Sequence, residues 1–279
     1  MIKAVERFVS KNHLGGDIMT KNSSTSIITS TVPSNPHVLV LTINRPPANA
    51  ISQSTYIEVT TILSSLRGRK DIRCVVLTGQ GEKFFSAGSD VNELGELNPN
   101  SARERSHYAR GAFESIRNCV VPVVAAVNGY ALGSGLVMSM LCDIVVASEH
   151  AKFGLPEINA GVMGGTKHLA RVVPEKVMRL MALTGRMLEA TELQKFGAVN
   201  YVCPKDRLME TALAIANEIA SKSPAAVGLM KEVMNLTESM DIATGYHVET
   251  YATAIITSHP HSKEAANAFK ERRPPNFQE

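Results

Sequence analysis

Short apolar runs alternate with amphipathic stretches over the first part of the chain. Five of these runs have the length of β-strands and lie at 37–44, 71–78, 120–127, 143–147 and 151–153. Apolar residues at helical spacing predict a helix capped by Ser52 or Ser54 that ends at about Leu66, and further helices at 102–117 and 135–141. Runs that are apolar throughout are typical of parallel strands buried on both faces. The pattern therefore predicts an α/β core.

The pattern changes after about Val172, where helical spacing replaces the apolar runs. Helices are expected at 175–183, 191–196, 208–221, 225–236, 242–257 and 262–270. At the other end, residues 1–35 lack a continuous apolar segment, so we expect neither a secretory signal nor a transit peptide. We divide the chain into a loose extension (1–35), an α/β core (36–172) and a helical region (173–279). Because a Ser/Thr/Asn-rich stretch follows Met19, translation from Met19 rather than Met1 is a hypothesis.

The composition is that of an ordinary globular protein. The chain has 279 residues, of which 44% are hydrophobic, and its net charge of +3 is too small to indicate a polyanion-binding protein. The longest uncharged apolar segment, 120–142, contains Pro122 and Gly129, which predicts strand, turn and helix there and no membrane span. Four cysteines lack the paired spacing of metal ligands, and we expect them to be reduced residues of a cytoplasmic protein: Cys74, Cys119, Cys142 and Cys203.

Two glycine-containing turns, at 79–90 and 128–136, follow predicted strands and lead into predicted helices. Turns of this kind leave backbone N–H groups unpaired at a helix N-terminus, where the helix dipole favours negative charge. Two such turns could converge on one oxygen. Neither turn matches the dinucleotide or phosphate-loop pattern, which argues against nucleotide binding. Leu132 breaks the nucleophile-elbow pattern around Ser134, so a serine hydrolase is a minor alternative.

Five segments in order carry a specific resemblance over most of the chain. They read FSAGSDV (85–91), PVVAAVNGYALGSG (122–135), CD (142–143), AKFGLPE (151–157) and GGT (164–166). From about His37 onward the chain resembles the crotonase superfamily, also called the enoyl-CoA hydratase/isomerase family. The resemblance implies an α/β spiral of stacked ββα units with a C-terminal helical trimerisation region, so that the protein forms a homotrimer or hexamer. It also implies an acyl-CoA thioester substrate, with no metal and no cofactor besides the CoA of the substrate.

By this resemblance the thioester oxygen lies between the backbone N–H groups of Ser89 and Ser134. Such an oxyanion hole stabilises the enolate formed next to the thioester, and one donor is typically worth about 3 kcal/mol. Asp90 is expected to cap the helix that begins there. Further residues of the two turns and the tail are expected to line the acyl-CoA: Lys83, Ala87, Gly88, Gly133, Gly135, Val137, Phe269, Lys270 and Arg272.

The carboxylates determine which reaction is expected. Hydratases of the family use two glutamates, of which the later one is present as Glu157, whereas Val137 occupies the place of the other. A single base suffices to shift a double bond, so isomerisation of an enoyl-CoA by Glu157 is the preferred function. Burial in an apolar pocket would raise the pKa of Glu157. Gly165 stands where dienoyl isomerases carry a second acid, which disfavours that subtype.

Several alternatives stay open at this point. A hydratase, dehydratase, decarboxylase or hydrolase on the same scaffold would use another polar group, for which His107 and Tyr130 are weaker candidates. A different class is a non-catalytic or RNA-binding relative, to which the basic cluster 67–70 would contribute, although nucleic acid is an improbable partner. We expect the other acids near the first turn to be solvated: Glu93, Glu96 and Glu114. The acyl group is left open because it depends on the loop 92–101.

Overall fold

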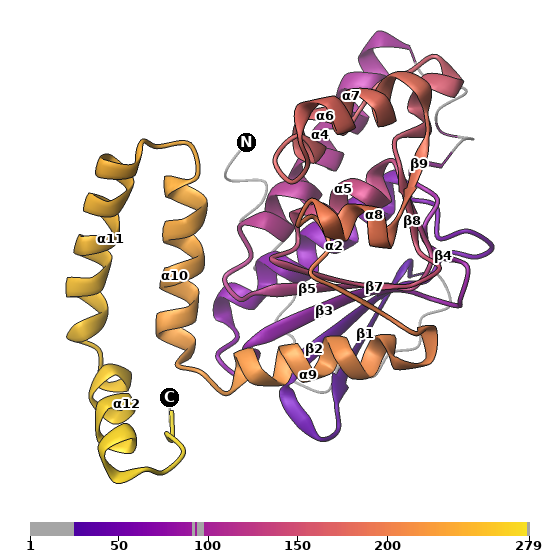
Figure 1. Cartoon of the computed structure of the whole chain (residues 1–279). Helices are drawn as coiled ribbons and strands as arrows, with labels where there is room; N and C mark the ends of the chain where they lie inside the picture. Colours follow the sequence, from indigo (N-terminus) through magenta and orange to yellow (C-terminus); the bar gives the residue numbers. More distant parts are fainter. Residues whose placement is uncertain (1–24, 91–92, 94–97, 278–279) are drawn as a thin grey trace.

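The computed structural model describes residues 25–90, 93 and 98–277, which form an α/β body and a layer of C-terminal helices beside it (Figure 1). In the described chain the larger sheet has the order β1-β2-β3-β5-β7-β10. Its strands are β1 (Ile27–Val32), β2 (Asn35–Ile43), β3 (Cys74–Gly79), β5 (Val123–Val127), β7 (Ile144–Ser148) and β10 (Tyr201–Cys203). The smaller sheet consists of β4 (Phe84–Ser86), β6 (Tyr130–Leu132), β8 (Lys152–Gly154) and β9 (Met187–Glu189), in that order.

The chain passes repeatedly from the larger sheet to the smaller sheet and then into a helix. β3 leads through β4 to α4 (Pro99–Arg117), and β5 leads through β6 to α5 (Ser134–Leu141). β7 leads through β8 to η2 (Pro156–Ala160), α6 (Thr166–Leu169) and α7 (Glu175–Thr184). Each passage is one ββα unit, and the units stack because successive strands pair in parallel within both sheets. The predicted spiral of ββα units is confirmed.

Alternate residues of the larger sheet enter two separate cores. Val75 and Val123 belong to the main core, which also contains buried side chains of α2 (Gln53–Ser65) and α4. Their neighbours Val76 and Val124 pack on the opposite face against α9 (Leu208–Ala220), which crosses beneath the sheet in Figure 1. Because both of their faces are covered, the central strands β3, β5 and β7 are apolar at nearly every position, as the sequence pattern predicts.

The predicted helices are present, and local chemistry accounts for their starts. The side chain of Ser52 accepts a hydrogen bond from the N–H of Thr55 and caps α2. α4 begins earlier than predicted because Asn98 caps it and Pro99 occupies its first turn. The helices of the second half are α7, α8 (Ala190–Lys195), α9, α10 (Pro224–Thr237), α11 (Ile242–Thr257) and α12 (Pro260–Glu271).

The predicted boundaries need two corrections. Residues 27–32, which we placed in the loose extension, form β1 and pair antiparallel with β2. The region after Val172 is not purely helical, because β9 extends the smaller sheet and β10 the larger one. These strands have three residues each, as do β4 and β6, and a run of three cannot show a periodicity. The hypothesis about Met1 and Met19 lies outside the described residues.

A buried ion pair fastens the C-terminal helices to the core. The ammonium of Lys231, on α10, lies 2.6 Å from a carboxylate oxygen of Asp143 and 3.2 Å from the carbonyl oxygen of Val121. Lys231 is only 3% exposed, so these oxygens take the place of its hydration shell. α11 and α12 pack on α10 and on each other.

Two further expectations concern the state of the cysteines and the possibility of a membrane-spanning helix. Cys74, Cys119 and Cys142 are buried, Cys203 is half-buried, and all four are free thiols, as expected. In the described part of the chain, no helix combines the length and the apolar character needed to cross a bilayer.

Candidate active site

The two glycine turns lie directly against each other. A Cβ added at Gly88 would lie 2.8 Å from the carbonyl oxygen of Leu132, and one added at Gly133 would lie 3.7 Å from the Cα of Gly88. Both glycines have positive φ angles, 91° and 51°, which residues with a side chain rarely adopt. The contact brings Ser89, on the first turn, beside Ser134, on the second, with their hydroxyl oxygens 3.1 Å apart. The structure thus unites the two predicted halves of the site.

Backbone hydrogen bonds hold each turn in place. Ile51 and Ser89 form an isolated parallel bridge, in which Ile51 donates its N–H to the carbonyl of Gly88. On the second turn, Gly133 donates its N–H to the carbonyl of Gly154, at the end of β8. Both turns are therefore anchored to neighbouring strands and loops, which limits their freedom to move apart.

The backbone N–H groups of Ser89 and Ser134 take part in none of the hydrogen bonds between described residues. Ser134 is the first residue of α5, so its N–H has no partner within that helix. The helix dipole adds positive potential at the same point. An oxygen held between the two serines could accept both hydrogen bonds, which is what the predicted oxyanion hole requires.

Glu157 reaches the same place from η2, directly after β8. A Cβ added at Gly133 would lie 2.6 Å from Oε1 of Glu157, so the carboxylate rests against the second turn. Its Oε2 is buried and has no hydrogen-bond partner among the described residues. Because burial removes water from the carboxylate, the pKa of Glu157 is raised above its usual range. A raised pKa suits a group that takes up and returns a proton near neutral pH.

Apolar side chains surround the positions where a second acid was considered. Val137, in α5, is 2% exposed. A Cβ added at Gly165 would lie 2.9 Å from Cγ2 of Val137 and 2.7 Å from Cδ2 of Leu155, and the φ angle of Gly165 is 74°. An aspartate or glutamate at position 165 would collide with both side chains. The packing thus disfavours an acid at position 165, and the single carboxylate, Glu157, stays a prediction.

One residue beside the turns is not predicted by the sequence. The hydroxyl of Tyr56, on α2, lies 2.6 Å from Oγ of Ser134 and 3.4 Å from Nη2 of Arg105. Tyr56 is 1% exposed and belongs to the main core with Val59. Its place among the apolar residues of α2 therefore predicts that the ring is buried but does not predict the contact of the hydroxyl. The signal that could have found it is the phenol hydroxyl, which needs a partner when it is buried. The hydroxyl of Ser134 is bonded to Tyr56 and Ser89 rather than to a histidine, which does not support a serine nucleophile.

Two acidic residues near the first turn are held by cations. Asp90 lies 2.6 Å from Arg45 and is 7% exposed. The expectation that Asp90 caps a helix concerns positions outside the described residues. Glu93, which we expected to be solvated, is half-buried and paired. Its carboxylate accepts hydrogen bonds from the N–H of Gln53, at the start of α2, and lies 3.8 Å from Nε of Arg105. The N-terminus of α2 explains this placement, because its free N–H groups favour a carboxylate.

The remaining described candidates of the core form neither a hydrogen bond nor an ion pair with Glu157. Glu114 and His107 are exposed, as expected of Glu114, and Tyr130 packs against Phe84. Lys83 is exposed and stands over the Phe84 ring. Glu96 lies outside the described residues. Two predicted lining residues belong to the turns themselves: Ala87 is half-buried, and Gly135 is buried so closely that an added Cβ would lie 2.7 Å from Cβ of Ser86.

The predicted CoA-binding residues of the tail are remote from Glu157 within one chain. Phe269 and Lys270 are exposed on α12, and Arg272 ends that helix with a φ angle of 53°. Figure 1 shows α12 on the far side of α10 from the strands and helices that carry the two turns. These three residues could reach such a site only on another copy of the chain, and their role stays a prediction.

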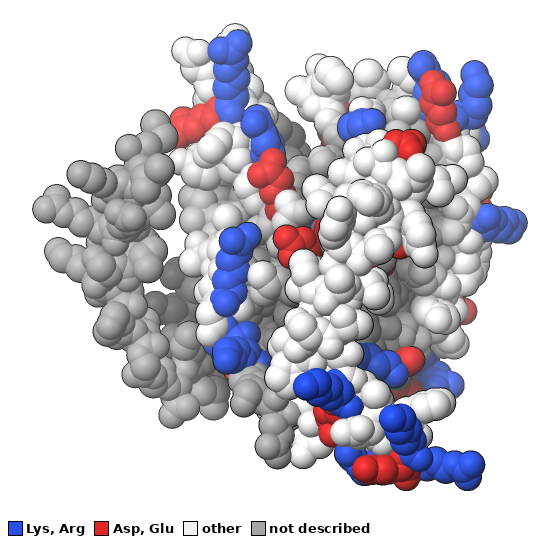
Figure 2. Space-filling view, turned by 90° about the vertical axis from the view of Figure 1, so that its left-hand side faces the viewer, with Lys and Arg blue, Asp and Glu red and all other residues white. Residues whose placement is uncertain are grey.

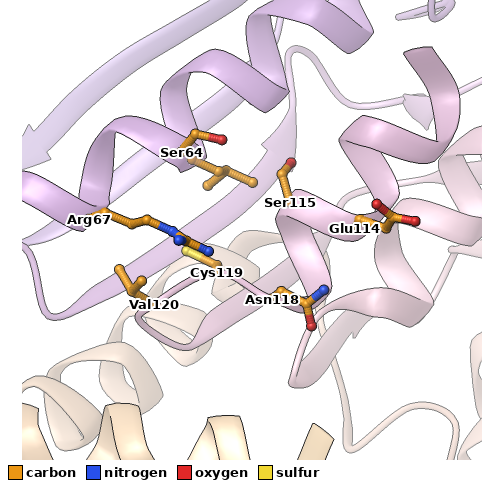
Figure 3. A pocket seen from close by; sticks show the side chains of 8 residues that line it. Ser64, Arg67, Glu114, Ser115, Asn118, Cys119 and Val120 are labelled. Atoms are coloured by element: carbon orange, nitrogen blue, oxygen red, sulfur yellow. The ribbon is translucent and has the colours of Figure 1, made fainter. Parts of the chain in front are cut away.

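A surface pocket of about 220 Å³ lies elsewhere, between the C-terminal ends of α2 and α4 (Figure 3). Its lining residues are Leu63, Ser64, Arg67, Glu114, Ser115, Asn118, Cys119 and Val120. No predicted catalytic residue lines it, and its walls mix charged and apolar side chains. The pocket therefore contributes nothing to the site around Glu157.

The raised pKa of Glu157 predicts how its removal affects stability. A carboxyl group whose pKa is higher in the folded protein stabilises the fold below its unfolded pKa of about 4.3, and that contribution is lost as the pH rises through the folded pKa. Glu157→Gln carries no charge and escapes this loss. We expect its melting temperature to exceed that of the parent by about 2 °C or more at pH 8 and to converge toward it near pH 4.

The measurement is thermal unfolding followed by circular dichroism across this pH range. Glu104→Gln, an exposed position on α4, is the matched control and should follow the parent throughout. A Glu157→Gln variant that is less stable than the parent at pH 8, or a difference independent of pH, would contradict the interpretation.

Comparison with known proteins places this geometry in a family. A family model described as enoyl-CoA hydratase/isomerase matches residues 34–279. Short-chain-enoyl-CoA hydratase from Clostridium acetobutylicum is 38% identical over 240 residues, which cover 85% of this chain and 92% of that protein. The (7aS)-7a-methyl-1,5-dioxo-2,3,5,6,7,7a-hexahydro-1H-indene-carboxyl-CoA hydrolase of Mycobacterium tuberculosis is 35% identical over 223 residues, which cover 80% of this chain and 90% of that protein.

Among solved structures, an enoyl-CoA hydratase from Bacillus anthracis superposes with a TM-score of 0.86 at 34% identity, covering 91% of this chain and 99% of that chain. The residues matched by the family model run from β2 to the C-terminal helices and leave out only β1 of the two sheets. The chain therefore belongs to the enoyl-CoA hydratase/isomerase family.

Proposed function

We propose that the protein shifts the double bond of an enoyl-CoA thioester, with Glu157 as the only acid–base group and the N–H groups of Ser89 and Ser134 as the oxyanion hole. The observation that carries the proposal is the position of the Glu157 carboxylate. Glu157 is half-buried, its buried Oε2 has no hydrogen-bond partner among the described residues, and the carboxylate rests against the turn that presents the Ser134 N–H.

The steps follow from this arrangement. Glu157 removes a proton from the carbon between the thioester carbonyl and the double bond, and the electron pair moves onto the thioester oxygen. Hydrogen bonds from Ser89 and Ser134 stabilise that oxygen while it carries the charge. Protonated Glu157 then returns the same proton two carbons further along the acyl chain. No atom is gained or lost, so the reaction requires no cofactor beyond the CoA of the substrate.

A single carboxylate is the main reason to place isomerisation first. Hydration is most easily achieved by two groups, one that orients water and one that supplies a proton. The side chain of Val137 can neither orient water nor supply a proton, and Gly165 has no side chain. Hydration or dehydration is nevertheless a second candidate, because the relatives named above include a short-chain-enoyl-CoA hydratase. A water held by hydroxyls such as that of Ser89 would then take the place of the missing acid.

Assays with matched thioesters discriminate between the two reactions. We expect conversion of 3-enoyl-CoA to 2-enoyl-CoA substrates, and a loss of turnover of about 10² to 10⁴ in Glu157→Gln. Because the base must be ionised, kcat/KM should rise with pH through a pKa above that of an ordinary glutamate. Release of a 3-hydroxyacyl product by the parent would favour hydration instead, and unchanged turnover in Glu157→Gln would exclude Glu157 as the base.

Substitutions at two glycines test the contact between the second turn and the Glu157 carboxylate. In Gly133→Ala the new methyl group would lie 2.6 Å from Oε1 of Glu157, so we expect turnover to fall about a hundredfold or more. Gly81→Ala is the matched control, since Gly81 also has a positive φ, 82°, but no atom lies within 4 Å of an added Cβ. It should lose stability but keep its turnover in the folded enzyme. Equal losses of activity in both variants would attribute the effect to backbone strain alone.

We also propose that the C-terminal helices join copies of the chain into a trimer or hexamer. α10 to α12 expose large apolar side chains, among them Met230, Met234, Ile242, Tyr246, Tyr251 and Ile255. Figure 2 shows the molecule from the side of α11, with broad uncharged areas between scattered charged side chains. An exposed apolar surface of this extent marks a protein contact. A second copy would also bring Phe269, Lys270 and Arg272 toward a site that they cannot reach in their own chain.

Sedimentation velocity should therefore show three or six associated chains. Ile255→Glu places a charge in this surface and should shift the protein toward the single chain, with weaker binding of CoA thioesters. Lys222→Glu, exposed before α10, is the control and should leave the assembly intact. A parent protein that sediments as a single chain would refute the assembly.

A further inference from the structure

Four polar side chains form a continuous line that ends beside the proposed oxyanion hole. Nη2 of Arg105 lies 3.4 Å from the hydroxyl of Tyr56, which lies 2.6 Å from Oγ of Ser134, which lies 3.1 Å from Oγ of Ser89. Tyr56 and Ser134 are buried, whereas Ser89 is partly exposed. The line therefore runs from the packed interior toward the place where a substrate would lie.

The chemistry of the groups sets the direction of the hydrogen bonds. Arginine has no acceptor, so Arg105 must donate to the oxygen of Tyr56. The single proton of Tyr56 then has Ser134 as its hydrogen-bond acceptor among the described residues, since a buried phenol left without one would cost free energy. Either serine could donate in the Ser134–Ser89 pair. We assign the donor role to Ser134, because its hydroxyl has no hydrogen-bond partner other than Tyr56 and Ser89 among the described residues. Of the three hydroxyl protons of the line, that of Ser89 is the one left without an acceptor among the other residues of the line.

We infer that the hydroxyl of Ser89 is a third hydrogen-bond donor to the thioester oxygen, oriented by Ser134, Tyr56 and Arg105. The inference rests on the proposed function, because it needs an acyl thioester between the two turns. The backbone nitrogen and Oγ of one serine are close enough that both can donate to the same oxygen. Ser89 contacts the substrate in this scheme, whereas Tyr56 and Arg105 are positioning residues.

The surroundings of Arg105 support a fixed orientation. Its guanidinium stands over the ring of Tyr56, with Cζ 5.6 Å from the ring centroid, and its Nε lies 3.8 Å from Glu93. Glu93 is itself held by the N–H of Gln53 at the start of α2. The positive end of the line is thus fixed between α2 and α4, and hydrogen bonds in such a chain strengthen one another in a buried site.

The vibrational frequency of a bound thioester carbonyl tests the inference without turnover. The probe is butanoyl-CoA, isotope-labelled at the carbonyl carbon, which has no double bond to shift. We expect its carbonyl stretch to fall to a lower frequency on binding to the parent, and part of this shift to disappear in Ser89→Ala and in Tyr56→Phe. Tyr108→Phe, which removes the hydroxyl of a partly buried tyrosine on α4, should match the parent.

Kinetics separate a positioning role from a merely structural one. With the best enoyl-CoA substrate, kcat should fall about tenfold or more in Ser89→Ala, with a smaller change in KM, and somewhat less in Tyr56→Phe. The double variant should be no slower than Ser89→Ala, because Tyr56 acts only through Ser89. Melting temperatures of all variants are measured in parallel, and Tyr56→Phe keeps the buried ring.

The outcomes are distinguishable. If the parent binds butanoyl-CoA and the carbonyl frequency is the same in Ser89→Ala and in the parent, the third donor is refuted while the proposed function stands. Additive losses in the double variant would refute the role of Tyr56 through Ser89. If the parent binds no acyl-CoA, the proposed function fails, and this inference fails with it.

Discussion

The contact between two glycine turns is the constraint on which the site depends. β4 and β6 are neighbouring parallel strands of the smaller sheet, so their carboxyl ends lie side by side and the turns that follow them must meet. They can meet at backbone distance only because Gly88 and Gly133 carry no side chain. The same absence of side chains leaves room for the Glu157 carboxylate, which enters from the end of β8, the next strand of that sheet. Strand order, glycine and carboxylate are thus parts of one arrangement.

How much of this was predictable depends on the length of each element. The long helices and buried strands follow from periodicity, and the two turns follow from their glycines after predicted strands. The roles of Ser89, Ser134 and Glu157 are implied by the family resemblance and stay predictions. Strands of three residues, such as β4 and β9, are too short for any pattern, although they determine which turns become neighbours. β1 escapes prediction for another reason: most of its residues are exposed, so its sequence lacks an apolar face.

Side-chain partners across the fold were less predictable than backbone positions. Tyr56 has the spacing of a core residue and is one, yet its hydroxyl reaches Ser134, which is 78 positions away in the chain. Glu93 has the character of a solvated acid, but the start of α2 captures it together with Arg105. Lys231 and Asp143 likewise meet only because α10 packs beside Val121 and Asp143, which lie just before β5 and β7. Each pairing depends on contacts between distant segments, which local sequence patterns do not encode.

The charges of the site explain why backbone dipoles suffice for the proposed reaction. Before proton transfer the negative charge lies on Glu157, and afterwards it lies on the thioester oxygen, so the number of buried charges does not change. The fold has to stabilise a charge that moves a short distance, not one that is created. A fixed cation beside Glu157 would lower its pKa and weaken it as a base, whereas N–H groups and an oriented hydroxyl at the oxygen favour the transfer selectively. This accounts for a Glu157 carboxylate whose Oε2 has no hydrogen-bond partner among the described residues, for an Arg105 that pairs with Glu93 and reaches Ser134 only through Tyr56, and for two turns whose proposed chemistry resides in the backbone.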